Sequence, residues 1–153
     1  MTYLEKPIFL EGTVVHGYGR GKEIKCPTAN LNAASLEEKL KDCENGVYFG
    51  WARINNDENI YKMVMSFGYN VYFGNKQFTI EAHILNDFKS DFYDQNLRLI
   101  VNGFIRPMLN FDSLDQLLEA IEKDKSIAKI ELEKEPFLKD QKNEFIAKVI
   151  KKN

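Results

Sequence analysis

The chain has 153 residues, of which 44 % are hydrophobic, and it carries a formal net charge of −2 at pH 7. This size and composition predict one domain, residues 1–153, with a normal core. The low charge argues against nucleic-acid binding, and no apolar run is long enough for a transmembrane helix. The first residues lack the core of a signal peptide, and Cys26 and Cys43 are expected to be free thiols, so we expect a cytoplasmic location.

The first two-thirds of the chain shows the alternation of apolar and polar residues that is typical of β-strands. We predict strands over residues 8–15, 47–54, 60–67, 78–85 and 96–105. In the second of these, Val47, Phe49 and Trp51 share one face, and Tyr48, Gly50 and Ala52 share the other. In the fourth, Phe78, Ile80, Ala82 and Ile84 share a face, opposite Thr79, Glu81 and His83.

A glycine-rich segment follows the first predicted strand, with glycines at positions 17, 19 and 21. Such a segment turns tightly, and its N–H groups can form an anion site, to which Arg20 and Lys22 add positive charge. Pro27 then precedes Thr28 and Asn30, whose oxygen atoms suit a nucleotide held with Mg²⁺. The spacing fits neither a Walker loop nor a dinucleotide fingerprint, and a simple glycine turn is the alternative.

The last third of the chain changes to helical periodicity. Ser113 is a candidate helix cap, with Gln116 three residues later as in a capping box. The residues Leu114, Leu117, Leu118, Ile121 and Ala128 then fall on one helical face. Phe145, Ile146, Val149 and Ile150 indicate a short final helix. Strands followed by a helix favour a mainly β fold, a closed antiparallel barrel with a C-terminal α-helix packed on it.

Several motifs, in order, resemble those of the riboflavin kinase family, from about Phe9 to about Lys134. They are Gly12-x-Val14-x-x-Gly17-x-Gly19-Arg20-Gly21, Pro27-Thr28-Ala29-Asn30-Leu31, Gly46-Val47-Tyr48-Phe49-Gly50-Trp51-Ala52, Lys62-Met63-Val64-Met65-Ser66-Phe67-Gly68, Ile80-Glu81-Ala82-His83-Ile84, Asp91-Phe92-Tyr93, Phe104-Ile105-Arg106-Pro107 and Asn110-Phe111. The chain departs from the family pattern at Lys25-Cys26, in a glycine loop one residue shorter, and at Met108-Leu109.

The resemblance implies a Greek-key β-barrel enzyme of the monofunctional type, which transfers the γ-phosphate of ATP to the 5′-hydroxyl of riboflavin and yields FMN and ADP. It implies that Glu81 is the catalytic base and that Thr28 and Asn30 ligate Mg²⁺, with Zn²⁺ or Mn²⁺ as alternatives. The implied nucleotide-binding residues are Gly17, Lys22, Thr28, Asn30, Ile84, Asn86 and Tyr93. The implied flavin-binding residues are Arg106, Leu109 and Phe111. We expect no FAD synthesis, because this length leaves no room for an adenylyltransferase domain. We also expect a monomer.

The residues by themselves leave plainer interpretations open. Glu81 alone fits a solvated strand glutamate, and both histidines, His16 and His83, fit structural roles. Arg106 fits a surface ion pair, and Phe111 fits the hydrophobic residue before a helix cap. At the level of the whole chain, the alternatives are a non-catalytic flavin- or nucleotide-binding barrel and a nucleic-acid-binding barrel, the second disfavoured by the net charge.

Overall fold

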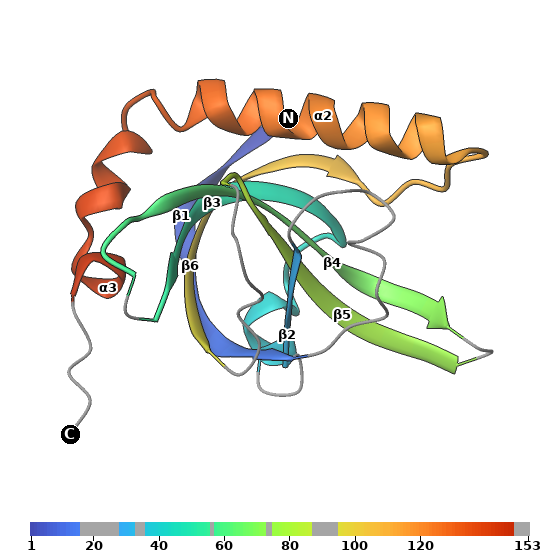
Figure 1. Cartoon of the computed structure of the whole chain (residues 1–153), viewed down its shortest axis with the longest axis horizontal. Helices are drawn as coiled ribbons and strands as arrows, with labels where there is room; N and C mark the ends of the chain where they lie inside the picture. Colours follow the sequence, from blue (N-terminus) through green and yellow to red (C-terminus); the bar gives the residue numbers. More distant parts are fainter. Residues whose placement is uncertain (16–27, 33–35, 56, 73–74, 87–94, 149–153) are drawn as a thin grey trace.

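The computed structural model describes residues 1–15, 28–32, 36–55, 57–72, 75–86 and 95–148. Its six strands are β1 (Thr2–Val15), β2 (Thr28–Leu31), β3 (Gly46–Ile54), β4 (Tyr61–Tyr72), β5 (Asn75–Ile84) and β6 (Asn96–Pro107). They close into an antiparallel barrel in the order β1-β2-β5-β4-β3-β6, and β4 and β5 continue together beyond it (Figure 1). The predicted closed barrel is confirmed.

The strands are longer than periodicity predicted, and one strand was missed. β1 begins at Thr2, and β4 runs on to Tyr72. Residues 28–31, for which no strand was predicted, form β2 between β1 and β5. A four-residue strand is too short to show an alternating pattern, and its buried residues Ala29 and Leu31 resemble any two apolar positions.

The described interior of the barrel is apolar. Ile80, Ala82 and Ile84 of β5 and Tyr48 and Ala52 of β3 belong to this core, as the alternation of the two strands predicted. Gly50, on the same strand, lies where a Cβ atom would stand 1.8 Å from the Ile100 carbonyl oxygen, so the close approach of β3 and β6 requires glycine there.

A second core lies outside the barrel, beneath the C-terminal helix. The helix α2 (Leu114–Glu131) packs across β4 and β3, as Figure 1 shows. Beneath it lie the outward residues of β3, Val47, Phe49 and Trp51, which contact Ala128, Leu132 and Phe137. The two predicted faces of β3 therefore serve two different cores.

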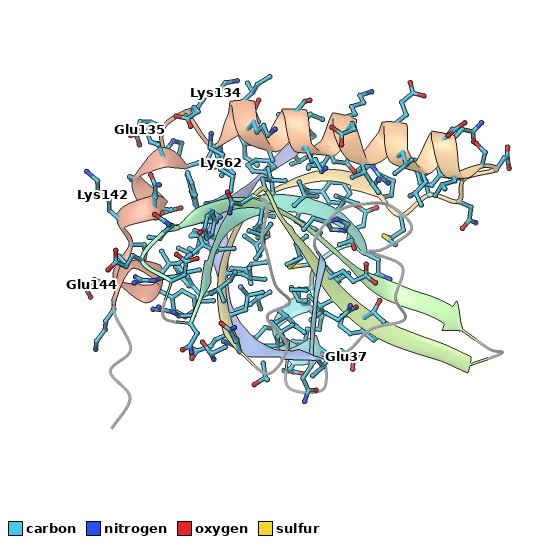
Figure 2. The ribbon with its side chains drawn as sticks, viewed as in Figure 1. Glu37, Lys62, Lys134, Glu135, Lys142 and Glu144 are labelled. Carbon is cyan, nitrogen blue, oxygen red and sulfur yellow. The ribbon has the colours of Figure 1, made fainter. Side chains whose placement is uncertain are left out.

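Short helices complete the chain. They are η2 (Glu37–Leu40), η3 (Leu138–Lys142) and α3 (Glu144–Ala147), the last at the position of the predicted final helix. Buried Arg53 and Arg98 donate hydrogen bonds to carbonyl oxygens of residues 145–148 and so hold α3 on the barrel. In Figure 2 the labelled charged side chains Lys134, Glu135, Lys142 and Glu144 lie at the outside of the molecule, along α2, η3 and α3. Among the described helices, none is long and apolar enough to cross a bilayer.

Candidate functional site

One transverse row of residues crosses the outer surface of the barrel. The strand register places Glu81 of β5 opposite Asn30 of β2 on one side and opposite Ser66 of β4 on the other. Ser66 is opposite Val47, and Val47 is opposite Arg106 of β6. Directly opposed residues of antiparallel strands point to the same face. This register therefore places Glu81, the predicted base, on one surface with Asn30, a predicted metal ligand, and Arg106, a predicted flavin contact.

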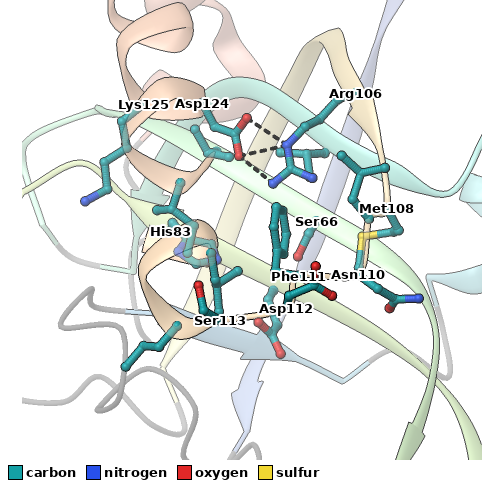
Figure 3. A pocket seen from close by; sticks show the side chains of 17 residues that line it. Ser66, His83, Arg106, Met108, Asn110, Phe111, Asp112, Ser113, Asp124 and Lys125 are labelled. Carbon is teal, nitrogen blue, oxygen red and sulfur yellow. Dashed lines mark hydrogen bonds and ion pairs between the residues drawn. The ribbon is translucent and has the colours of Figure 1, made fainter. Parts of the chain in front are cut away.

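A cavity of about 720 Å³ lies over the part of this row from Glu81 to Arg106, between the barrel and the first two-thirds of α2. This volume falls within the roughly 300–1,000 Å³ of small-molecule sites. Its walls come from three places: the outer faces of the strands, the loop of residues 107–113, and α2. The lining residues include Val64, Ser66, Glu81, His83, Arg106, Met108, Leu109, Phe111, Leu114, Leu117, Ile121, Asp124 and Lys125 (Figure 3).

A buried ion pair fixes one end of the cavity. Arg106 donates to both carboxylate oxygens of Asp124, from Nε at 3.0 and 3.3 Å and from Nη2 at 2.8 Å. Burial raises the pKa of Asp124, and the hydrogen bonds and charge of Arg106 oppose that shift. The carbon at the centre of the Arg106 guanidinium lies 5.6 Å from the centre of the Phe111 ring. These contacts hold α2, β6 and the Phe111 ring together.

Hydrogen bonds at the start of α2 hold the same loop. The Ser113 hydroxyl accepts a hydrogen bond from the Gln116 N–H at 3.2 Å, which confirms Ser113 as the cap. The Gln116 side chain accepts in return from the Asp112 N–H at 3.1 Å. Phe111 thus enters the cavity from a segment that is fixed at both of its ends.

His83 lies two residues beyond Glu81 on the same face of β5. Its ring is buried, and no group that the structure describes forms a hydrogen bond with Nδ1. Burial, and then the positive charge of Lys125, lower its pKa to about 4, so the imidazole is neutral at pH 7. The two side chains that share this strand face therefore differ: Glu81 is partly exposed and acidic, whereas His83 is buried and neutral.

The structure brings together some of the predicted site residues and not others. Glu81, Arg106, Leu109 and Phe111 all line the cavity. Ile84 is buried inside the barrel, and Asn86 is exposed just beyond β5. Gly17, Lys22, Cys26 and Tyr93 lie outside the described residues, and for Thr28 only the backbone, opposite His83, is described. The nucleotide and metal roles of these residues stay predictions.

Sequence reasoning missed the contribution of α2 to the cavity. The predicted apolar face of α2 is not only a packing surface, because Leu114 is 49 % exposed, and Leu117 and Ile121 line the cavity. One signal was present: Asp124 follows Ile121 by three residues and precedes Ala128 by four, so a carboxylate occupies a buried-face position. Such a position requires a partner, and that partner is Arg106.

The strand register fits the predicted metal ligands. Ala29 and Leu31 are buried in the barrel core, so strand alternation turns Asn30 to the outer surface, opposite Glu81. Amide, hydroxyl and carboxylate oxygens are the donors that Mg²⁺ prefers. Within the described part of the chain, no group of three His, Cys, Asp or Glu side chains has the arrangement of a metal site.

Comparison with protein families gives one match that covers most of the chain. Residues 4–132 match the family model described as "Flavokinase: Riboflavin kinase". The matched region contains α2 and all of the barrel except the first two residues of β1, and therefore every residue that lines the cavity.

Similar proteins and structures agree with this match. A riboflavin kinase from Homo sapiens is 40 % identical over 91 % of this chain and 90 % of its own length. A bifunctional riboflavin kinase/FMN phosphatase from Arabidopsis thaliana is 42 % identical over 93 % of this chain, which spans 38 % of that protein. The crystal structure of riboflavin kinase from Trypanosoma brucei superposes with a TM-score of 0.77 at 28 % identity, covering 96 % of this chain and 93 % of that one.

Proposed function

The chain belongs to the riboflavin kinase family, and from that premise we propose that Glu81 is the general base of a phosphoryl transfer from ATP to the 5′-hydroxyl of riboflavin. The observation that supports this role is the position of Glu81. It lines the cavity, and its register partners are Asn30 and Ser66, so the only carboxylate of the row lies beside the predicted metal ligand.

The cavity provides the two environments that the flavin requires. Met108, Leu109 and Phe111 form an apolar wall suited to the isoalloxazine ring, next to the Arg106–Asp124 pair. The strands on the other side present Glu81 and Ser66, where the hydroxyl-rich ribityl chain would be solvated by polar groups. The 5′-hydroxyl would then lie within reach of the Glu81 carboxylate.

The proposed reaction balances as a simple transfer. The 5′-oxygen attacks the γ-phosphorus of ATP, the bond from that phosphorus to the bridging oxygen breaks, and Glu81 takes the hydroxyl proton. The products are FMN and ADP. Catalysis in such transfers rests mainly on positioning and on electrostatic stabilisation.

The family in general uses ATP and a divalent metal, and we propose that Thr28 and Asn30 hold Mg²⁺ in this chain. When bound, the ion would offset the negative charge that develops during the transfer.

Incubation with riboflavin, ATP and Mg²⁺, followed by chromatographic separation of the flavins, tests the function. We expect FMN and no FAD. Failure to form FMN with Mg²⁺, Zn²⁺ or Mn²⁺ would contradict the proposal.

Thr28→Ala and Asn30→Ala should each raise the Mg²⁺ concentration needed for activity, while riboflavin binding changes little. An unchanged Mg²⁺ dependence in both variants would remove the ligand assignment.

A further inference from the structure

Two consecutive charged residues of α2 diverge over the cavity. Asp124 reaches the β6 side, where it pairs with Arg106. Lys125 lines the cavity on the β5 side, near His83, as Figure 3 shows. Successive helical residues differ by about 100° in direction, and α2 lies across β4, so the two side chains turn to opposite flanks of that strand.

The two flanks correspond to the two ends of the proposed substrate. The β6 flank carries the apolar wall with Phe111, which is suited to a flavin ring. The β5 flank carries Glu81, and β2 with Asn30 lies beyond it. The 5′-phosphate of the flavin product would therefore lie on the same flank as Lys125.

Lys125 pairs with an exposed carboxylate of the same helix, which is one of its interactions. Its Nζ atom lies 3.0 Å from Oε1 of Glu122, whose side chain is 70 % exposed, whereas the Lys125 side chain is 20 % exposed. An ion pair with one solvent-exposed partner contributes little to stability. A phosphate dianion carries more charge and more acceptor oxygens than one carboxylate, so it is the stronger partner for the ammonium group.

A second observation indicates that the Lys125 ammonium lies near His83. The ring is buried at the cavity wall, and its pKa is lowered first by burial and then by the Lys125 ammonium. The positive charge thus acts on the outer face of β5, two residues from Glu81.

We propose that Lys125 contacts the phosphate group at the reacting end of the cavity and so makes this chain favour flavins that carry a 5′-phosphate. The inference rests on the proposed function, because it takes Glu81 to mark the 5′-oxygen. It adds a protein cation to a site whose other predicted phosphate contacts are the metal and the glycine loop.

Riboflavin and FMN differ only by that phosphate, so their relative affinities test the proposal. Dissociation constants for both would be measured by flavin fluorescence, with ADP and Mg²⁺ present throughout, for the wild type, Lys125→Met and the control Lys129→Met. Lys129 is an exposed lysine of the same helix. We expect Lys125→Met to weaken FMN binding about tenfold or more, the range of a charged hydrogen bond, and to change riboflavin binding less than twofold. The control should change neither.

A conservative variant separates charge from packing. Lys125→Arg keeps the cation and should retain most of the preference for FMN, and the affinity of the wild type for FMN should fall with salt more steeply than that of Lys125→Met. Equal losses for both flavins in folded Lys125→Met, or an unchanged affinity for FMN, would overturn the proposal. A wild type that forms no FMN would contradict the proposed function instead, so the two failures are distinguishable.

Discussion

The two ends of α2 contact the barrel in different ways. At its C-terminal end, Ala128 and the adjoining Leu132 are fully buried against Trp51 and Phe137. At its N-terminal end, Leu114 is half exposed and Leu117 lines an open cavity. One apolar stripe therefore packs at one end and borders a binding site at the other. A helical stripe shows that a face avoids water, but not whether protein or ligand covers it.

Asp124 marks the boundary between the two ends. It is 3 % exposed, lines the cavity and pairs with Arg106 of the barrel. Changes on the cavity side of this boundary should alter catalysis and binding, and changes on the packed side should alter stability. The predictions below test this division, from the largest effect to the smallest.

The largest effect is expected on the cavity side, from Glu81→Gln. The amide keeps the shape of the side chain but cannot accept the hydroxyl proton, and general-base catalysis contributes about 10²–10⁴-fold. We expect kcat to fall by that factor, roughly 3–5 kcal/mol of transition-state stabilisation, with little change in Tm or in flavin affinity. The measurement is kcat of a variant shown to be folded by circular dichroism.

Glu119→Gln, the same change at an exposed position of α2, is the matched control and should leave kcat unchanged. A kcat of Glu81→Gln within a few-fold of the wild type would show that Glu81 is not the base. The simpler interpretation of a solvated strand glutamate would then be preferred.

On the packed side, Leu132→Ala should act on stability alone. Removing a fully buried leucine typically costs about 2–5 kcal/mol, and each 1 kcal/mol lowers Tm by about 2–4 °C in a chain of this size. The activity per folded molecule should stay close to that of the wild type. Thermal unfolding and an assay well below Tm measure the two quantities.

Leu114→Ala makes the same substitution at the other end of α2 and serves as the matched control. Because Leu114 is 49 % exposed, its Tm should change by no more than about 2 °C, a loss below about 0.5 kcal/mol. If both variants lost the same stability, the proposed division of α2 would fail.

The sequence predicted the fold well because its strands carry strong local signals. Alternation in residues 47–54 assigned Val47 and Tyr48 to different faces, and those faces became different cores. The Ser113 cap was equally local. By contrast, β2 becomes a strand only through pairing with β1 and β5, which no local pattern records.

The site was predicted unevenly for a related reason. Glu81 and Arg106 were named from the family resemblance, but periodicity alone made them ordinary surface residues. Their proximity depends on the register of four strands, a long-range property. Lys125 was missed because its value as a site residue depends on how α2 crosses β4, which depends in turn on the packing of residues far apart in the chain.

At the boundary itself, Asp124→Asn should affect both properties moderately. The amide is nearly isosteric but loses the negative charge that neutralises Arg106, whose side chain is only 20 % exposed. Hydrogen bonds to charged groups contribute about 1.5–3 kcal/mol, so we expect stability to fall by about 1–3 kcal/mol. Riboflavin affinity should also fall several-fold, because Arg106 and the loop beside it lose their fixed position.

Asp115→Asn, at an exposed position in the first turn of α2, is the control for the loss of one negative charge. The decisive observation for Asp124→Asn is the pair of results from chemical denaturation and flavin titration. A loss of stability with unchanged flavin affinity would place Asp124 entirely on the packed side of the boundary.

The smallest effect is expected from Phe111→Ala, which should weaken riboflavin binding alone. Phe111 is partly exposed at the cavity wall, and its ring lies beside the Arg106 guanidinium, so its removal takes one apolar surface from the flavin. Aromatic pairs contribute about 0.5–1.5 kcal/mol beyond the area they bury, which corresponds to an affinity loss of up to about tenfold. Phe111→Leu keeps an apolar wall without the aromatic ring and should lose less. Because Phe111 also precedes the Ser113 cap, circular dichroism must show that α2 persists in both variants. Unchanged flavin affinity in folded Phe111→Ala would mean that the ring binds elsewhere, and the N-terminal end of α2 would then be an exposed apolar face rather than the wall of a flavin site.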